Sequence, residues 1–398
     1  MARHHRTVII GGGSAGITVA ARLRRAGETD VAVVEPAMTH YYQPLWTLVG
    51  GGAAPLEESA RPMAAVMPRG VTWITDAAAE VDPDACEVTL AGGETVRYDH
   101  LVVCPGIQLD WGKIAGLGET LGRDGVSSNY RYELAPATWR FIRETRSGTA
   151  VFGMPSGPIK CAGAPQKIAY LAADHWRRQG VLENIDVHLV LPTPGMFGVK
   201  VFSDALERVV DDYGITVHLT SEVTAVDAAH RTATVTDVTT RETTTLPYDV
   251  MHLAPPQSAP DWIKKGSLAD AANPNGYVEI DKHTMRHVRY GNVFALGDVG
   301  SSPNSKTGAA IRKQAPVMVE NLRAVMTGRE PTARYEGYSS CPFTTSQSEM
   351  LLAEFDYSLT PQPSFPFIDT TRPRRDMWYL KRYGLPFLYW NLMLRGLA

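Results

Sequence analysis

The first 35 residues constrain the fold more strongly than any other part of the chain. An apolar run at 7–10 leads directly into the sequence Gly-Gly-Gly-Ser-Ala-Gly at 11–16. Residues 17–26 then have the pattern of a helix, and a second apolar run at 31–34 ends on Glu35. A strand, a glycine-rich turn, a helix and a second strand in this order predict a βαβ unit within a parallel sheet.

The glycine spacing and the terminal acid of this unit point to a nucleotide. In the pattern G-x-G-x-x-G, the glycines allow a tight turn and let the backbone approach a pyrophosphate at the helix N-terminus. Glu35 lies where a carboxylate accepts hydrogen bonds from ribose hydroxyl groups. The alternative is an ordinary glycine-rich turn, but the placement between strand and helix favours a dinucleotide.

A second signature, far downstream, indicates which dinucleotide is bound. The sequence Asn-Val-Phe-Ala-Leu-Gly-Asp at 292–298 predicts a buried strand that ends in Gly297 and Asp298. Flavoproteins with two dinucleotide-binding domains use this pattern to hold the ribityl and pyrophosphate region of FAD. Asp298 is expected to accept a ribityl hydrogen bond, and a helix from about Thr307 to direct its dipole at the flavin. The two signatures predict FAD, against the alternative of an ordinary βα turn.

The middle of the chain is predicted to form a second βαβ unit without a glycine signature of its own. Residues 149–152 and 185–191 are predicted strands, and residues 164–178 are a predicted helix. The loop at 153–163 contains two prolines and Cys161 where an NAD(P)H-binding domain carries G-x-G-x-x-G. The loop therefore argues against nicotinamide as the electron donor and indicates a donor that reacts at the protein itself.

Composition and charge exclude several classes of partner. The chain has 398 residues and a net charge of −3, so its charge does not favour nucleic acid. No apolar segment with a cleavage site precedes the first strand, and no stretch of about twenty apolar residues follows, so neither a signal peptide nor a membrane span is expected. The four cysteines lack metal-ligand spacing, and no metal site is predicted.

Two of these cysteines are candidates for redox chemistry. Cys161 precedes a predicted helix, and helix-terminal amides lower the pKa of a thiol. Cys341 lies far along the chain, and sequence distance does not decide whether the two meet. Two unrelated buried cysteines, each acting as a small apolar residue, are the alternative.

The tail at 374–398 combines aromatic and basic side chains. We predict two short amphipathic helices, broken at Gly384 and Pro386, that lie on a membrane surface. The alternative is a C-terminal helix packed on the core or on a dimer partner.

Several long segments resemble one family of flavoproteins, the type II, mitochondrial-like group of sulfide:quinone oxidoreductases in the flavin disulfide-reductase-like superfamily. These segments are residues 41–50, 158–167, 338–342, 352–357 and 386–395. The similarity runs along nearly the whole chain.

The resemblance implies an α/β fold with two Rossmann-like dinucleotide-binding domains and a C-terminal membrane-associating region. The second domain is an inserted, degenerate NAD(P)-like domain. The predicted divisions are an FAD-binding domain at 1–147 and 276–330, the inserted domain with Cys161 at 148–275, and a C-terminal region with Cys341 at 331–398.

The resemblance also implies the site residues. Cys161 and Cys341 form the redox disulfide, with Cys161 as the thiolate near the flavin and Cys341 as the carrier of a persulfide. With the glycine signatures, the predicted contacts of non-covalent FAD are Gly11, Gly12, Gly13, Ser14, Gly16, Glu35, Gln43, Ala78, Gly297, Asp298 and Lys306. Ala78 is expected to contact the adenine side through its backbone. Lys306 is expected near the pyrimidine end of the flavin, although a solvated surface lysine is its alternative.

Two cysteines fall outside the implied pair. Cys104 follows the apolar run at 101–103, where relatives usually have a small residue, and is predicted to pack near the adenosine half of FAD. Cys86 lies in a polar, turn-like stretch and is predicted to have no role. The third cysteine that type I members carry before the pair has no counterpart near 120–130.

The implied activity is the oxidation of hydrosulfide by a membrane quinone. The sulfane sulfur is expected to pass to a small acceptor such as sulfite, glutathione or another thiol. The expected location is peripheral, on the cytoplasmic face of a membrane, and a second copy of the chain in a homo-oligomer is a further expected partner.

Three alternatives stay open. A type II NADH:quinone reductase is disfavoured by the missing second glycine signature, and a flavocytochrome-type sulfide dehydrogenase requires a haem partner. A non-catalytic FAD-binding interaction protein or sulfide sensor would tolerate loss of the cysteine pair.

Overall fold

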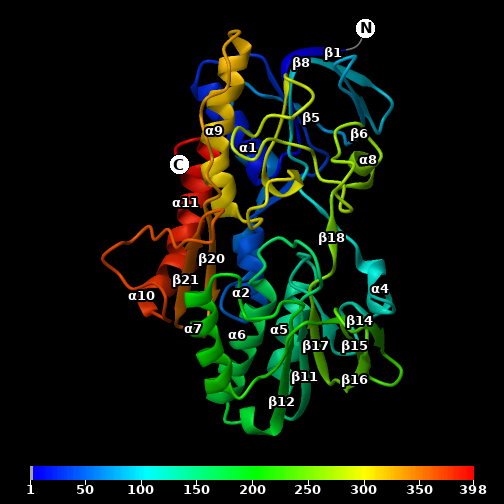
Figure 1. Cartoon of the computed structure of the whole chain (residues 1–398), viewed down its shortest axis with the longest axis vertical. Coiled ribbons are helices and arrows are strands. Elements are labelled where there is room, and N and C mark those ends of the chain that lie inside the picture. The colour runs from blue at the N-terminus through cyan, green and yellow to red at the C-terminus, as the bar shows by residue number, and fades with distance from the viewer. Residues whose placement is uncertain (1–2) are drawn as a thin grey trace.

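A mainly parallel sheet built around the first βαβ unit forms one end of the molecule, the upper part of Figure 1. The computed structural model describes residues 3–398. The last four residues of β1 are buried, as expected for a strand covered on both faces. In sheet order the strands are β5 (Thr72–Ile74), β2 (Val31–Val34), β1 (Arg3–Ile10), β8 (Thr95–Val103), β7 (Glu87–Leu90) and β6 (Ala78–Asp82), with β19 (Val293–Ala295) paired to β8.

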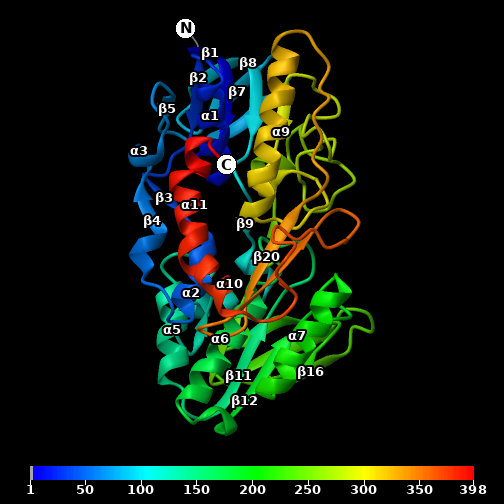
Figure 2. The ribbon, with the colours of Figure 1, turned by 90° about the vertical axis from the view of Figure 1, so that its left-hand side faces the viewer.

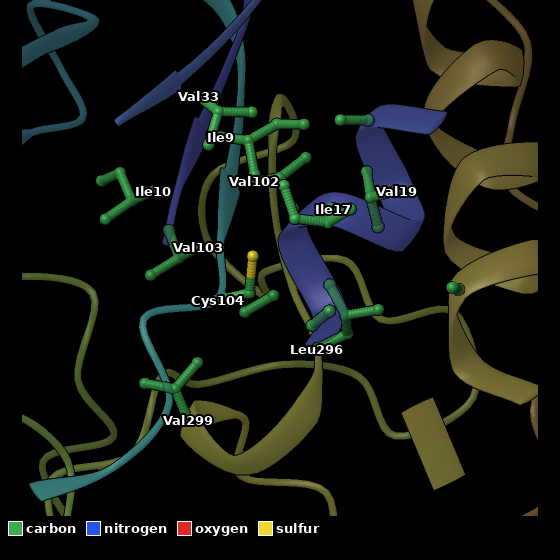
Figure 3. Packing of buried hydrophobic residues seen from close by; sticks show 14 of the residues in the cluster. Ile9, Ile10, Ile17, Val19, Val33, Val102, Val103, Cys104, Leu296 and Val299 are labelled. Carbon is green, nitrogen blue, oxygen red and sulfur yellow. The ribbon is translucent and has the colours of Figure 1, made fainter. Parts of the chain in front are cut away.

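Helices α1 (Ser14–Arg25) and α9 (Gly308–Met326) pack against each other beside this sheet. Figure 3 shows Ile17 of α1 beside Ile9 and Val102 of the strands, within one hydrophobic core. Thr307 caps α9, since its hydroxyl accepts a hydrogen bond from an N–H in the first turn. The predicted strand at 292–298 is shorter than expected, because the chain turns into a 3-10 helix, η5 (Gly297–Val299), after β19.

A second, fully parallel sheet forms the other end of the molecule (Figure 1). Its strands in order are β10 (Val126–Ser127), β17 (Val250–Leu253), β11 (Gly148–Gly153), β12 (Ile185–Val190) and β13 (Thr216–His218). Helices α5 (Ala135–Glu144), α6 (Ala164–Arg178) and α7 (Lys200–Tyr213) accompany it. The predicted helix at 164–178 is confirmed, and both predicted strands end within one residue of their predicted ends.

Small antiparallel elements join and flank the two sheets. The pair β9 (Gln108–Leu109) and β18 (Gln257–Ser258) lies where the chain passes between the sheets. The hairpin of β20 (Ser339–Thr344) and β21 (Met350–Phe355) contacts both α6 and α9. The other elements are β3 (Thr39–Tyr41), β4 (Ala60–Pro62), β14 (Ser221–Asp227), β15 (Thr232–Asp237), β16 (Thr243–Pro247), α2 (Trp46–Gly50), α3 (Met63–Val66), α4 (Leu117–Thr120), α8 (Asp261–Lys264), η1 (Gln43–Leu45), η2 (Leu56–Ser59), η3 (Trp111–Lys113) and η4 (Leu182–Asn184).

The C-terminal segment is one continuous helical stretch, and the predicted break at Gly384 and Pro386 is wrong. Helix α10 (Arg375–Tyr379) passes through a π-helical turn, η6 (Leu380–Gly384), into α11 (Leu385–Asn391), followed by η7 (Met393–Arg395). Pro386 lies directly after the π turn and, having no N–H, donates no backbone hydrogen bond to it. The wider π turn before it relieves the clash of the proline ring with the preceding turn.

This segment lies against α1 and the first sheet (Figure 2). The side chains of Tyr389, Trp390, Met393 and Leu394 are part of the core of that sheet. Within residues 3–398, no helix has the length and apolar character that crossing a membrane requires.

The division of the chain into domains stays a proposal. Strand β10 and helix α5 precede residue 148, yet β10 pairs within the second sheet and α5 packs on it. We propose that the inserted domain draws on residues before 148 as well as on 148–275.

Candidate active site

The predicted nucleotide loop connects β1 to α1 and is tightly packed on one side. Gly11 has a φ of +99°, and a Cβ there would collide with the carbonyl of Cys104. A Cβ on Gly16 would collide with the carbonyl of Gly11. At Gly13, by contrast, a Cβ would meet nothing within 4 Å, so the loop is open on the side where a pyrophosphate is expected.

Glu35 holds this loop from the end of β2. One carboxylate oxygen accepts from the N–H of Gly12 at 2.7 Å, and the other accepts from the N–H of Ala37 at 2.7 Å. The side chain is half-buried, which leaves it accessible to a ribose. The open loop and the carboxylate beside it fit a dinucleotide.

The Gly297–Asp298 turn meets the start of α1. Gly297 has a φ of +74°, and a Cβ there would lie 3.4 Å from the Cβ of Ala15. Burial raises the pKa of Asp298, while the ammonium groups of Lys306 and Lys160 oppose this shift. The structure therefore places the turn against the start of α1, with its carboxylate in the field of two lysines.

Lys306 is buried, with 6% of its surface exposed, so the alternative of a solvated surface lysine is wrong. Its Nζ donates to the carbonyls of Asp298 at 2.6 Å and Gly300 at 3.0 Å, and lies 3.9 Å from the ring centroid of Tyr277. Burial lowers the pKa of Lys306 to about 8, and Asp298 opposes this shift.

Gln43 and Ala78 lie on the periphery of the site. The amide oxygen of Gln43 accepts from Nζ of Lys160 at 2.6 Å, which ties the segment after β3 to the loop before Cys161. Burial lowers the pKa of Lys160 to about 8, and Asp298 opposes this shift. Ala78 begins β6 and packs against the core of the first sheet.

The structure brings Cys161 and Cys341 together. Their Sγ atoms lie 3.8 Å apart, in contact but separated by more than the disulfide bond length of about 2.05 Å, so the structure describes two free thiols. Cys161 has a φ of +55°, a conformation that costs a non-glycine residue about 1–2 kcal/mol. Its N–H donates to the carbonyl of Lys306 at 2.8 Å, which fixes the loop of the second sheet on the first.

Gly163, at the N-terminus of α6, allows this approach. A Cβ at this position would lie 2.6 Å from Sγ of Cys341 and would collide with the ring of Phe343. Strand β20 therefore packs directly on the start of α6. Because the cysteine pair covers this helix terminus, the loop at 153–163 does not form an open pyrophosphate cradle.

Lys167 supplies the positive charge at the pair. Its Nζ lies 3.0 Å from Sγ of Cys161, and only 3% of its surface is exposed. Burial opposes charge on Lys167, but the two sulfurs outweigh burial and raise its pKa.

The two thiols have opposite pKa shifts. A hydrogen bond from Cys341 lowers the pKa of Cys161 well below its usual range, against the effect of burial, and Lys167 adds to the lowering. Burial, followed by the hydrogen bond and charge of Cys161, raises the pKa of Cys341. In the reduced pair, Cys161 is therefore the more acidic thiol and Cys341 the less acidic one.

The C-terminal segment adds a further amine. Lys381, in η6, is 3% exposed, and its Nζ donates to the carbonyl of Pro44 at 2.9 Å. Burial, followed by repulsion from Lys167, lowers the pKa of Lys381 to about 7.

The two remaining cysteines lie away from the pair. Cys104 is buried behind the nucleotide loop, as Figure 3 shows, with Sγ 3.7 Å from the carbonyl of Gly11, and burial raises its pKa. Cys86 lies in the turn between β6 and β7, with Sγ 3.4 Å from the amide of Asn292.

An α/β fold with two Rossmann-like sheets and a cysteine pair between them defines the class of flavin-linked disulfide oxidoreductases. Residues 5–315 match the family described as pyridine nucleotide-disulphide oxidoreductase. The chain is 39% identical over 396 residues to the mitochondrial sulfide:quinone oxidoreductase of Mus musculus, covering 99% of this chain and 87% of that protein. The chain therefore belongs to the sulfide:quinone oxidoreductases.

Other relatives agree with this assignment. The mitochondrial sulfide:quinone oxidoreductase of Schizosaccharomyces pombe is 37% identical over 418 residues, which cover 99% of this chain and 90% of that protein. The X-ray structure of the sulfide:quinone oxidoreductase from Aquifex aeolicus superposes with a TM-score of 0.83 at 20% identity, over 99% of this chain and 92% of that chain. At this identity the superposition shows the fold alone.

Proposed function

We propose that this chain oxidises hydrosulfide at the Cys161–Cys341 pair and transfers the electron pair through non-covalent FAD to a membrane quinone. The observation that carries the proposal is the contact of two thiols at 3.8 Å, one of them beside a buried ammonium. The N–H of Cys161 donates to the carbonyl of Lys306, whose ammonium donates to the carbonyl of Asp298. FAD, when bound, accepts the electron pair released as the disulfide forms and passes it to the quinone.

We propose that the predicted residues hold FAD through the open nucleotide loop and the turn beside it. The backbone of the loop, with Gly11, Gly12, Gly13, Ser14 and Gly16, would face the pyrophosphate, and Glu35 the ribose. The backbone of Ala78 would lie toward the adenine. Gly297, Asp298, Lys306 and Gln43 would lie toward the ribityl and flavin end.

The difference between the two thiol pKa values indicates which of the two sulfurs hydrosulfide attacks. Thiol–disulfide exchange is faster when the departing sulfur has the lower pKa, and this sulfur is Cys161. Hydrosulfide would therefore attack Sγ of Cys341, so that the bond between the two cysteines breaks. The products are a persulfide on Cys341 and a thiolate on Cys161, which the ammonium of Lys167 stabilises.

The cycle closes in two steps at the same cysteines. The sulfur of a small acceptor, such as sulfite, glutathione or another thiol, attacks the outer sulfur of the persulfide, and Cys341 leaves as a thiolate. When no other acceptor is present, a second hydrosulfide takes this place, so that sulfide alone reduces the flavin. The two thiolates then form the disulfide again and give up two electrons.

The loop before Cys161 supports sulfide over nicotinamide as the donor. Its backbone pairs with Lys306, and the start of α6 is covered by the cysteine pair and Phe343. This packing disfavours a type II NADH:quinone reductase. The contact between the two thiols also disfavours a non-catalytic FAD-binding protein or sulfide sensor, which would not need the pair. The exposed aromatic row on the C-terminal helix, described in the next paragraph, favours a lipid surface over the haem partner of a flavocytochrome-type enzyme.

The C-terminal helix supports peripheral membrane contact. Tyr379, Tyr383 and Phe387 follow one another at helical spacing and are 61%, 56% and 62% exposed. The opposite face of the same helix packs into the core. An exposed aromatic row on a helix whose opposite face is buried is typical of a helix that lies in a membrane interface.

Replacing this row by serine (Tyr379→Ser, Tyr383→Ser and Phe387→Ser together) is expected to weaken binding to phospholipid vesicles by at least about tenfold. Each large apolar side chain moved out of water contributes about 1.5–3 kcal/mol. The measurement is vesicle cosedimentation, with Val288→Ser, an exposed residue near β19, as the control. Equal binding by the triple variant and the wild type would contradict membrane contact through this row.

Steady-state turnover tests the proposed function. The purified protein is expected to reduce a short-chain quinone in the presence of sulfide and FAD, with a rate that rises with sulfide and saturates. Quinone reduction that depends on NADH and not on sulfide would instead assign the chain to the NADH:quinone reductases.

A further inference from the structure

The C-terminal helix contacts the predicted nucleotide loop through one side chain. The hydroxyl of Tyr389, in α11, lies 2.7 Å from Oγ of Ser14 and 2.6 Å from Nε2 of His40. Nδ1 of His40 lies 3.0 Å from the carbonyl of Gly12. Three segments of the chain therefore form one chain of hydrogen bonds, close to where η7, which follows α11, packs on α1.

The donor and the acceptor of each hydrogen bond in this chain follow from the Gly12 carbonyl at its end. The carbonyl of Gly12 can only accept, so Nδ1 of His40 carries the proton. Burial lowers the pKa of His40 to about 4, against the effect of the Gly12 hydrogen bond, so the ring is neutral near pH 7 and its Nε2 accepts from Tyr389. The oxygen of Tyr389 is then left to accept from the hydroxyl of Ser14.

This arrangement fixes the two peptide groups on either side of the Gly12 Cα. Gly12 is held at its N–H by Glu35 and at its carbonyl by His40. The hydroxyl proton of Ser14 is used within the chain, so the loop faces a phosphate with backbone N–H groups of the first turn of α1. The N–H groups are thus oriented before a ligand arrives.

The surroundings of Tyr389 make this contact rigid. Its ring centroid lies 4.4 Å from that of Tyr42, and both side chains are buried. Beyond it, Gly396 packs against the backbone of α1, where a Cβ would lie 2.9 Å from the amide nitrogen of Arg22. The C-terminal end of the chain therefore packs on α1, the helix that begins at the nucleotide loop.

We infer that Tyr389 is a positioning residue for FAD, through which the C-terminal helix holds the nucleotide loop in its binding conformation. The inference rests on the proposal that FAD binds the loop at 11–16. It adds that tight retention of FAD requires a hydroxyl group from the opposite end of the chain.

The test is FAD retention by Tyr389→Phe, which removes the hydroxyl and keeps the ring. We expect the Kd for FAD, measured by titration of the apoprotein, to rise roughly tenfold, because buried His40 and half-buried Ser14 lose their shared partner. The control is Tyr213→Phe, which removes a buried hydroxyl bonded to the carbonyl of Thr345 in another part of the molecule.

Thermal unfolding with and without FAD separates positioning from general stability. A ligand that binds only the folded state raises the Tm by an amount that depends on its Kd. For Tyr389→Phe we expect the FAD-induced rise in Tm to shrink, relative to both the wild type and Tyr213→Phe. His40→Gln is expected to weaken FAD binding in the same direction.

The outcomes distinguish the inference about Tyr389 from the proposed function. Wild-type protein that binds FAD, with an unchanged Kd in Tyr389→Phe, would overturn this inference alone. An equal loss of apoprotein Tm in both tyrosine variants, with the FAD-induced rise intact, would overturn it as well. A wild-type protein that binds no FAD would overturn the inference together with the proposed function.

Discussion

Replacing Cys161 by serine is expected to slow the reduction of bound flavin by sulfide by at least about a thousandfold, the scale of loss when a reacting group is removed. Serine cannot form the disulfide that hydrosulfide attacks, nor the thiolate that Lys167 stabilises. The measurement is anaerobic stopped-flow absorbance of the oxidised flavin after mixing with sulfide. The same result is expected for Cys341→Ser.

The matched control for these variants is Cys86→Ser, since Cys86 lies in a turn away from the pair. It should reduce its flavin at the wild-type rate. Chemical reduction by dithionite should bleach the flavin in all three variants, which shows that the flavin itself is still reducible. Sulfide reduction at wild-type rates in both Cys161→Ser and Cys341→Ser would eliminate the proposed mechanism.

Replacing Lys167 by methionine is expected to raise the pKa of the Cys161 thiol by about 1–3 units, the usual effect of an opposite charge at this range. The ammonium, 3.0 Å from Sγ, favours the thiolate and holds this pKa low. Without it the thiol stays protonated to higher pH, so less thiolate is present at a given pH below the new pKa. Methionine has a similar volume, which keeps the packing of this buried position.

The readout is the long-wavelength charge-transfer absorbance between a thiolate and the oxidised flavin, followed against pH. In the wild type the band should persist to low pH, and in Lys167→Met its midpoint should move to higher pH. Lys200→Met, which removes an exposed lysine from α7, is the control. Identical midpoints in Lys167→Met and the wild type would mean that this ammonium does not set the thiolate.

Local patterns were sufficient to predict the framework of the fold. The βαβ unit at 7–35 and the helix at 164–178 are confirmed, because glycine turns, continuous apolar runs and helical spacing are patterns that act over a few residues. The resemblance to the family also placed two cysteines from distant segments, Cys161 and Cys341, in contact. Spacing along the chain alone left that pairing open.

The residues that surround the pair were not predictable from local pattern. Lys167 lies one turn into α6 and Lys381 lies in the tail, and both read as ordinary charged helix residues in the sequence. Their burial depends on how β20 and the C-terminal segment pack around α6. His40 likewise has no partner in its own stretch of sequence, since Tyr389 is 349 positions away.

The tail shows how tertiary packing overrides a local signal. Gly384 and Pro386 predicted a break, but the π turn carries the helix through them. Sequence reasoning also leads to the expectation that removal of residues 374–398 leaves a soluble flavoprotein with impaired quinone reduction. Because this segment supplies core side chains and Tyr389, we expect truncation to cost FAD and stability instead.

The most direct measurement is anaerobic mixing of the FAD-loaded protein with sulfide and, separately, with NADH, while the oxidised-flavin absorbance is recorded. Rapid bleaching by sulfide, with none by NADH, is the result that a cysteine pair at the flavin and a covered α6 N-terminus predict. Bleaching by NADH with no response to sulfide would contradict the account, since it would mean that the loop at 153–163 binds nicotinamide and that the pair does not react with the donor.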